Sequence, residues 1–263
     1  MPDAETTDTV RIDELTWPEL EALTKAGPPV VIIPVGSLEQ HGPHMALGVD
    51  RVLPQAVAER VAARMGALVA PAVAYGYKSQ PKSGGGNHFP GCASLDGDTL
   101  VRLVRDVICD FARHGLTRIA LFNGHMENGW FLTEAADLAL RQMIAEGVSG
   151  VRIVKLGYWD FISPETEATL FPHGRPTWEL EHAAVMETSC MLHLAPGMVR
   201  ADLIPDDPEA DFPPYEIFPA DLRPIPPTGV LAPAGSASAD KGRAVIEQVV
   251  PDIAAALARA FTE

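Results

Sequence analysis

The sequence has few cysteines, few basic residues and no long hydrophobic run. Its three cysteines, Cys92, Cys109 and Cys190, are an odd number, lie far apart and form no C-x-x-C motif. A disulfide framework is therefore not expected, and we predict a reducing compartment. The amino-terminal stretch MPDAETTDTVRIDEL also lacks the basic and apolar segments of a secretion signal. We expect a cytoplasmic protein.

These shortages exclude two classes of partner. No apolar run reaches the ~18 residues that a membrane-spanning helix needs. Lysine and arginine together number 20, against 35 aspartates and glutamates, so the net charge is −15. Nucleic acids and anionic membrane surfaces are bound through clustered basic residues. We therefore expect neither a nucleic acid nor a membrane as a partner.

Apolar residues make up 47% of the 263 residues, and they fall into alternating strand-like and helical segments. Short apolar runs typical of strands lie at 30–36, 67–76, 118–124 and 151–161. Helical spacing of apolar residues occurs at 51–66, 98–115, 127–147, 179–194 and from about 236–239 to the end. This order predicts one α/β domain over 1–263, with a mostly parallel sheet flanked by helices on both faces. The proline-rich region 201–234 is expected to form an irregular wrap or an oligomer contact.

Polar and aromatic side chains follow three of the four predicted strands. In open α/β sheets, ligands bind beyond the carboxyl ends of the strands, so residues at these ends are expected to meet. In chain order, the residues after the first and third strands are Glu39, His41, His44 and Asp50, then His125 and Glu127, and the end of the fourth strand carries Tyr158, Trp159 and Asp160. A shared site at this edge would explain why polar groups stand at the ends of buried strands, where they are costly if unsatisfied.

The types of side chain at this edge indicate a metal centre. Glu39 and His41 are two residues apart, as are His125 and Glu127, and in extended backbone such pairs point to the same side. Imidazoles combined with carboxylates suit Zn²⁺ or Mn²⁺. Asp50 has two oxygens and could bridge two ions, which at a separation of about 3.5–4 Å would hold a hydroxide as nucleophile. His44 is expected to support the site without binding metal.

Two other stretches are open to more than one interpretation. The glycine-rich segment 75–91 lacks the G-K-[ST] ending of a phosphate-binding loop, so we expect its glycines to let the backbone approach a ligand closely. Trp178 stands in a loop with nearby proline and glycine, where its ring could hold a planar ligand. Glu181, His182 and Glu187 do not share one face of a helix, because their offsets are five and six residues. They can meet if the helix begins near His182.

Taken together, these motifs resemble the creatininase family, also called creatinine amidohydrolases, along nearly the whole chain. The stretches that carry the resemblance are PVGSLEQHGPHM, VD at 49–50, YGYKSQPKSGGGNHFPG with SLDG, NGHMEN, YWDF, and WELEH through ET. The E-Q-H-G-x-H pattern is specific to the broad family, and the glycine-rich loop, YWDF and W-x-x-E-H narrow it to members that act on creatinine.

The resemblance implies a creatininase-like fold, a binuclear Zn²⁺ or Mn²⁺ centre, the reversible hydrolysis of creatinine to creatine, and commonly a homohexamer. By matching positions, it places one ion on Glu39, Asp50 and His125, and the other on His41, Asp50 and either Glu127 or Glu187. It implies a substrate pocket formed by Ser83, Trp159, Trp178, Glu179, Glu181 and His182. His182 would carry a proton to the ring nitrogen, and Glu127 would orient a second water.

Two positions depart from the family pattern, and two other functions remain open. Met126 occupies a position in NGHMEN where tyrosine is usual, and Glu179 stands where aspartate is expected. If the side chain of Met126 lines the pocket, the substrate could differ. A relative acting on another small amide, a formamide or a peptide is one alternative. A metal-dependent binding protein without turnover is the other, and the presence of acid–base groups disfavours it.

Overall fold

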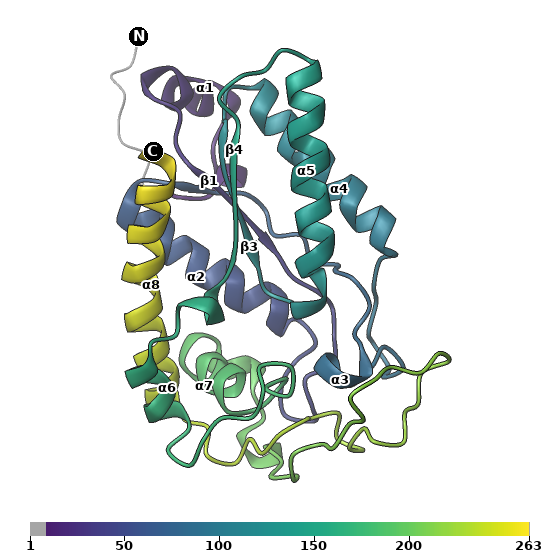
Figure 1. The fold of residues 1–263 in the computed structure, drawn as a ribbon. Helices are drawn as coiled ribbons and strands as arrows, with labels where there is room; N and C mark the ends of the chain where they lie inside the picture. The colour runs from purple at the N-terminus through teal and green to yellow at the C-terminus, as the bar shows by residue number, and fades with distance from the viewer. Residues whose placement is uncertain (1–8, 263) are drawn as a thin grey trace.

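The computed structural model describes residues 9–262. Its sheet has four parallel strands in the order β2-β1-β3-β4: β1 (Val31–Val35), β2 (Leu68–Val69), β3 (Arg118–Asn123) and β4 (Arg152–Gly157). Val35 pairs with Asn123, and Asn123 with Gly157, so β1, β3 and β4 end level with one another. The segments that follow these three strands therefore start at one edge of the sheet (Figure 1).

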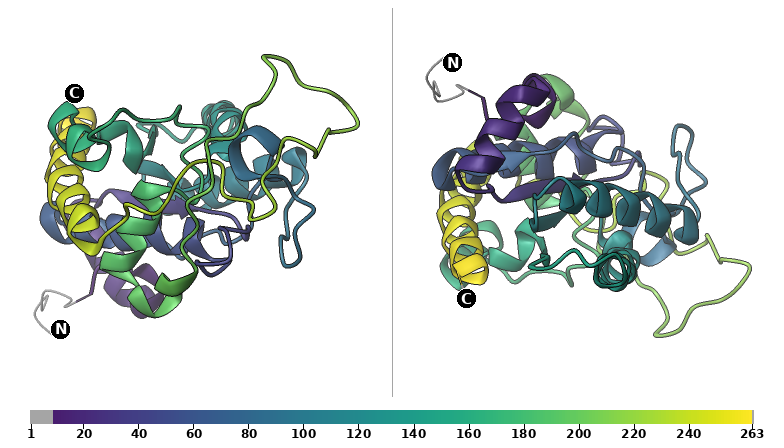
Figure 2. Two further views of the ribbon diagram at one scale, coloured as in Figure 1. Left: turned by 90° about the horizontal axis from the view of Figure 1, so that it is seen from below. Right: turned by 90° about the horizontal axis from the view of Figure 1, so that it is seen from above.

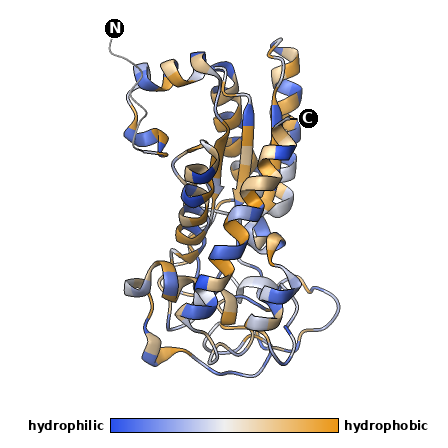
Figure 3. Cartoon of the chain, turned by 90° about the vertical axis from the view of Figure 1, so that its left-hand side faces the viewer, coloured by the Kyte–Doolittle hydropathy of each residue, from blue (hydrophilic) through white to orange (hydrophobic). Residues whose placement is uncertain are grey.

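Helices cover both faces of the sheet (Figures 1 and 2). One face packs against α2 (Val49–Met65), α7 (Val185–Leu194) and α8 (Ala239–Thr262), and the other against α4 (Gly97–Arg113) and α5 (Gly129–Ala145). Alternation along β1 divides the core between the faces: Ile32 packs in the first layer, and Val31 and Ile33 in the second. Figure 3 shows the largely hydrophobic strands between helices that carry both hydrophobic and hydrophilic residues. The predicted fold class is confirmed.

The remaining described elements are short. They are the helices α1 (Trp17–Ala26), α3 (Pro81–Gly84) and α6 (Pro164–Leu170), and 3₁₀ turns at Ile12–Glu14, Met126–Asn128, Tyr158–Phe161, Pro196–Met198 and Ala201–Leu203. Within residues 9–262, no helix combines the length and the apolar character needed to cross a membrane.

Three predicted segments are longer in the sequence pattern than in the structure. The fourth strand was expected over 151–161, but β4 ends at Gly157 and the 3₁₀ turn Tyr158–Phe161 follows it. The second strand was expected over 67–76, but only Leu68–Val69 pair in the sheet, followed by an isolated bridge between Val35 and Val73. Pro71, which lies between them, has no N–H to donate to a ladder. The helix expected over 179–194 begins at Val185, after a run of turns. Apolar periodicity alone predicts neither the early end of β2 nor the late start of α7.

The start of α7 is shaped by a left-handed residue and two carboxylates. Ala183 has φ of 56°, a conformation that a helix does not contain. Glu181 accepts a hydrogen bond from the Met186 N–H at 2.6 Å, and Glu187 accepts one from the Ala183 N–H at 2.7 Å. These bonds satisfy backbone donors around the turn, and they tie both glutamates to a fixed backbone.

The proline-rich region 201–234 crosses the carboxyl edge of the sheet with little regular structure, as predicted (Figure 1). Part of it, drawn in yellow-green, projects as a loop from the body of the molecule (Figure 2). Tyr215, Ile217, Phe218 and Leu222 are exposed apolar side chains in this region.

Candidate metal centre and substrate pocket

Asp50 reaches the carboxyl edge of the sheet because two glycines let α2 approach the strand ends. A Cβ on Gly36, just after β1, would lie 2.3 Å from the Asp50 carbonyl oxygen. A Cβ on Gly124, just after β3, would lie 2.4 Å from the same atom. Neither position can hold a larger residue unless the first turn of α2 moves. Both glycines therefore fix Asp50 between the segments that carry Glu39 and His125.

The predicted metal ligands form two groups that share one aspartate. Ligand atoms of Glu39, Asp50 and His125 lie within 4.8 Å of one another, and so do those of His41, Asp50 and Glu187. His125 Nδ1 is 2.8 Å from Glu39 Oε2 and 3.2 Å from Asp50 Oδ2, while His41 Nε2 is 3.0 Å from Asp50 Oδ1. The shared position of Asp50 is the geometry expected of a bridging ligand.

Several of these ligand atoms are buried without a hydrogen-bond partner. Among the described residues, Glu39 Oε1, His41 Nε2, Asp50 Oδ2 and Glu127 Oε2 have neither solvent contact nor a partner with hydrogen-bond geometry. Leaving buried polar atoms unsatisfied costs free energy. Divalent cations would satisfy these oxygen and nitrogen atoms, and the donor set is one that Zn²⁺ and Mn²⁺ accept. The residues present therefore fit a metal centre.

The electrostatics of the cluster also favour a cation. Burial raises the pKa of Glu39 to about 8, and nearby His125 only partly opposes this effect. Burial alone would lower the pKa values of His41 and His125, but neighbouring carboxylates outweigh it and raise both. For Asp50, burial works toward a higher pKa, but the two histidines prevail and lower it. The cluster thus pulls protons onto its histidines, and metal ions would replace that positive charge.

Glu127 stands beside this cluster and outside both ligand groups. Its Oε1 accepts hydrogen bonds from the Gln80 N–H at 2.9 Å and from the Ser83 hydroxyl at 2.8 Å. Its Oε2 lies 3.4 Å from His125 Nε2 and carries no hydrogen bond. Of the two carboxylates considered for the second ion, the geometry therefore groups Glu187 with His41 and Asp50, and places Glu127 beside His125 without including it in a ligand group.

A small cavity of about 40 Å³ opens onto the cluster. Its lining comprises Glu39, Asp50, Ser83, Gly124, His125, Met126, Glu127, Trp159, Trp178, Glu181, His182, Met186 and Glu187. Nearly all the predicted site residues thus meet here, and His41 belongs to the adjoining ligand cluster. Of the lining residues, the sequence patterns did not point to Met186, since it reads as an ordinary apolar residue of a helix.

Glu179 is the exception among the predicted pocket residues. It is exposed and lines a neighbouring cavity of about 680 Å³, formed largely by the proline-rich region. Its neighbour Trp178 turns to the metal side instead, so the two residues face different cavities. Ser83 lines both cavities, which makes it the point where they adjoin.

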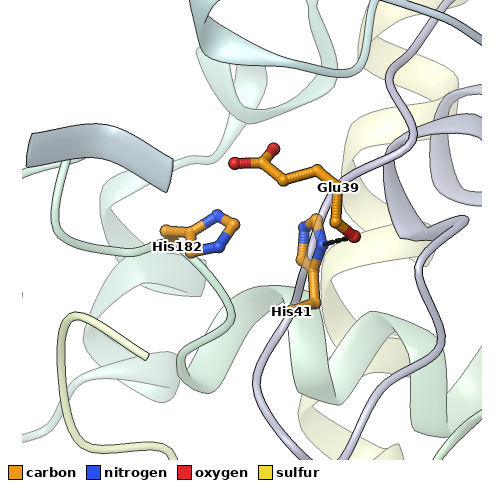
Figure 4. Close-up of side chains that lie close together, drawn as sticks. All are labelled: Glu39, His41 and His182. Carbon is orange, nitrogen blue, oxygen red and sulfur yellow. Dashed lines mark hydrogen bonds between the residues drawn. The ribbon is translucent and has the colours of Figure 1, made fainter. Parts of the chain in front are cut away.

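His182 and the two tryptophans line the same cavity as the metal ligands, and a ring nitrogen of His182 lies within 4.8 Å of ligand atoms of Glu39 and His41. The His182 and His41 rings have centroids 4.5 Å apart, and Figure 4 shows both rings beside the Glu39 carboxylate. Burial, together with the nearby charge of His41, lowers the pKa of His182 to about 3. Trp178 is half-buried against the core, and the Arg175 guanidinium lies 4.3 Å from its ring centroid. His44 is outside the cavity, hydrogen-bonded through Nε2 to Thr188 at 2.8 Å.

Comparison with known proteins agrees with this geometry. The creatininase family model, described as creatinine amidohydrolase, matches residues 13–257. A creatinine amidohydrolase from Pseudomonas putida is 50% identical over 253 residues, covering 96% of this chain and 97% of that protein. A mycofactocin precursor peptide peptidase from Mycobacterium tuberculosis is 33% identical over 249 residues, covering 88% and 85%. A solved manganese form of creatininase, 50% identical, superposes with a TM-score of 0.94 over 97% of this chain and all of that one. The chain belongs to the creatininase family.

Proposed function

We propose that this protein is a metal-dependent cyclic amide hydrolase that opens creatinine to creatine in a reversible reaction. The observation that carries this proposal is the pair of ligand groups sharing Asp50, with four buried ligand atoms in and beside them left unpartnered. The high identity to a creatinine amidohydrolase over nearly the full length points to the same substrate.

Glu39, Asp50 and His125 would hold one divalent ion, and His41, Asp50 and Glu187 the other. When bound, two Zn²⁺ or Mn²⁺ ions would polarise the lactam carbonyl and lower the pKa of a water molecule for attack on it.

The side chains around the cavity would orient the substrate and move protons. Trp159 and Trp178 provide flat walls for a planar ring, and Ser83 provides a hydroxyl at the mouth of the cavity. The free Oε2 of Glu127 faces the cluster and can orient a second water. As hydroxide adds to the carbonyl carbon and the ring C–N bond breaks, the ring nitrogen needs a proton. His182, which lines the same cavity, is the residue we assign to deliver it.

The proposal extends to the assembly and location of the protein. We propose a single domain over 1–263, a cytoplasmic location and a homohexamer, as the family resemblance implies. The exposed apolar side chains of the projecting loop, Tyr215, Ile217, Phe218 and Leu222, are suited to burial against another subunit. Sedimentation analysis of the purified protein tests the hexamer directly.

Elemental analysis of the purified protein is the first test of the metal centre. After mild dialysis we expect nearly two divalent ions per chain, because each of the two ligand groups that share Asp50 can hold one ion. Removing the ions with a chelator should abolish creatine formation, and adding Zn²⁺ or Mn²⁺ should restore it. Full activity in metal-free protein would exclude the mechanism. Metal-loaded protein that binds creatinine without producing creatine would favour the binding-protein alternative.

Trp178→Ala is expected to lower kcat/KM for creatinine about 10- to 100-fold, since a misplacement of about 1 Å can cost 10²-fold. Its metal content should stay unchanged, because Trp178 lines the cavity but belongs to neither ligand group. Trp130→Ala is the matched control, since Trp130 is 84% exposed on α5 and does not line the cavity. If Trp178→Ala lowers only the melting temperature and spares turnover, Trp178 is a packing residue alone.

A further inference from the structure

Gln40 lies between two metal ligands in the sequence, and its side chain is buried at the back of the site. It is 5% exposed, and its amide occupies a slot bordered by glycines from two distant segments. A Cβ on Gly229 would lie 2.4 Å from Gln40 Oε1, and one on Gly85 would lie 2.8 Å from Gln40 Nε2. The slot therefore fits this amide closely and leaves no room for a side chain at either glycine.

The hydrogen bonds of Gln40 fix which way its amide points. Its Oε1 accepts a hydrogen bond from the Gly42 N–H at 2.8 Å. Its Nε2 lies 3.0 Å from the Gly84 carbonyl and 2.9 Å from the Gly229 carbonyl. A backbone N–H can only donate and a carbonyl can only accept, so a flipped amide would leave all three groups unsatisfied. Both amide hydrogens are consequently used by the two carbonyls.

This arrangement leaves only one good partner for His182 Nε2. The atom lies 2.9 Å from Gln40 Nε2 and 3.0 Å from the Gln40 main-chain oxygen. Since the amide has no third hydrogen, Nε2 cannot accept from it without depriving a carbonyl. The main-chain oxygen can only accept. Every group is satisfied when Nε2 carries a hydrogen and donates it to the Gln40 oxygen.

The other ring nitrogen of His182, Nδ1, is not held by a hydrogen bond within the described part of the chain. Among the described residues, His182 Nδ1 has no hydrogen-bond partner, yet it is not one of the fully buried unpartnered atoms. His182 lines the cavity over the metal ligands and its Nε2 is held against Gln40, so we infer that Nδ1 is the ring nitrogen that opens onto the cavity. In the tautomer that Gln40 imposes, Nδ1 is the nitrogen with a free lone pair.

We propose that Gln40 is a positioning residue that holds His182 as its Nε2–H tautomer, with Nδ1 as the atom that exchanges protons with the substrate. The proposal rests on the proposed function for the use made of Nδ1. In the hydrolytic direction, Nδ1 takes a proton from the attacking water while Nε2–H stays bonded to Gln40. Nδ1 then gives that proton to the ring nitrogen as the C–N bond breaks, and the hydroxyl stays on the carbonyl carbon.

Nitrogen-15 NMR of the zinc-loaded protein, labelled on its histidines, tests the tautomer without reference to activity. The His182 signals, assigned by their loss in His182→Asn, should show a protonated Nε2 and an unprotonated Nδ1. A protonated Nδ1, or rapid averaging between tautomers, would overturn the inference. Creatine formation is measured on the same sample. Its absence from protein with the expected tautomer would refute the proposed function alone.

Gln40→Met supplies the second measurement, because it keeps the length of the side chain and removes its hydrogen bonds. We expect kcat to fall about 10- to 100-fold, the range typical of residues that orient a site's ligands, with KM little changed and both ions retained. The His182 signals should lose their single-tautomer pattern. Gln55→Met is the matched control, as it removes two bonds, to Arg51 and Glu59, from the surface of α2. An unchanged kcat together with an unchanged tautomer in folded Gln40→Met would contradict the proposal. If that variant does not fold, the nitrogen-15 spectrum of the wild-type protein still tests which nitrogen of His182 is protonated.

Discussion

Asp50→Asn is expected to deplete both metal sites and to reduce creatine formation by more than the ~10²–10³-fold that losing one electrostatic group typically costs. Asp50 is the residue that the two metal-ligand groups share; one group contains Glu39 and the other contains Glu187. The substitution preserves the shape of a side chain that is 3% exposed, so the loss of charge is the main change. Metal content by elemental analysis and creatine formation by kinetic assay measure the two effects.

Asp160→Asn is the matched control for this prediction. Asp160 also follows a strand at the carboxyl edge of the sheet, but its carboxylate accepts the Gly157 N–H at 2.9 Å and does not line the metal cavity. We expect a small loss of stability with two ions and full activity. If Asp50→Asn keeps both ions, Asp50 is not a bridging ligand and the two ligand groups need another explanation.

The metal cluster could be predicted from the sequence because its residues follow strands in register. Val35 and Asn123 end level with each other, so Glu39 and His125 are delivered to one edge by the parallel sheet itself. The 2.8 Å contact between these two side chains joins residues far apart in the sequence. The general rule for parallel sheets was sufficient here, since it depends on strand order and direction and not on details of the loops.

The other side of the site could not be predicted from periodicity. Glu181, His182 and Glu187 meet only because the chain turns at Ala183 in a left-handed conformation before α7 begins. An alanine gives no local signal for such a turn, because its preferred conformations are right-handed or extended. The hydrogen bonds that the Met186 N–H donates to Glu181 and the Ala183 N–H donates to Glu187 stabilise the turn, and they become visible only in the folded chain.

Gln40 and Glu179 show two ways in which sequence patterns fail in loops: the first residue has no signal in the sequence, and the second is assigned to the wrong cavity. The role of Gln40 has no signal in the sequence, because a glutamine between two ligands carries no periodicity and its partners Gly84, at the end of α3, and Gly229 lie in distant segments. Glu179 was placed in the pocket by its match to a family position, yet it lines the neighbouring cavity. Loop positions one residue apart can face different cavities, so motif spacing there does not settle the direction of a side chain.

His182→Asn, assayed with several substrates, distinguishes hydrolysis of creatinine from hydrolysis of another small amide, a formamide or a peptide. General acid–base groups typically contribute about 10²–10⁴-fold, so kcat should fall by a factor in that range. Both ions should be retained if the two groups that share Asp50 hold them, because neither of these groups includes His182. Loss of an ion in His182→Asn would instead point to the third group, Glu39, His41 and His182. His88→Asn is the control, since His88 is exposed on the glycine-rich loop and does not line the cavity.

The measurement is creatine formation from creatinine, run beside a panel of formamides and amino-terminal peptides. The panel is needed because Met126 lines the cavity at a position where the resemblance to the family leads us to expect tyrosine, and because one relative is a peptide peptidase. We expect turnover of creatinine and a parallel loss of that turnover in His182→Asn. Activity confined to the panel would refute creatinine as the substrate. It would leave the metal centre and the family intact, since neither depends on which amide the two tryptophans hold against His182.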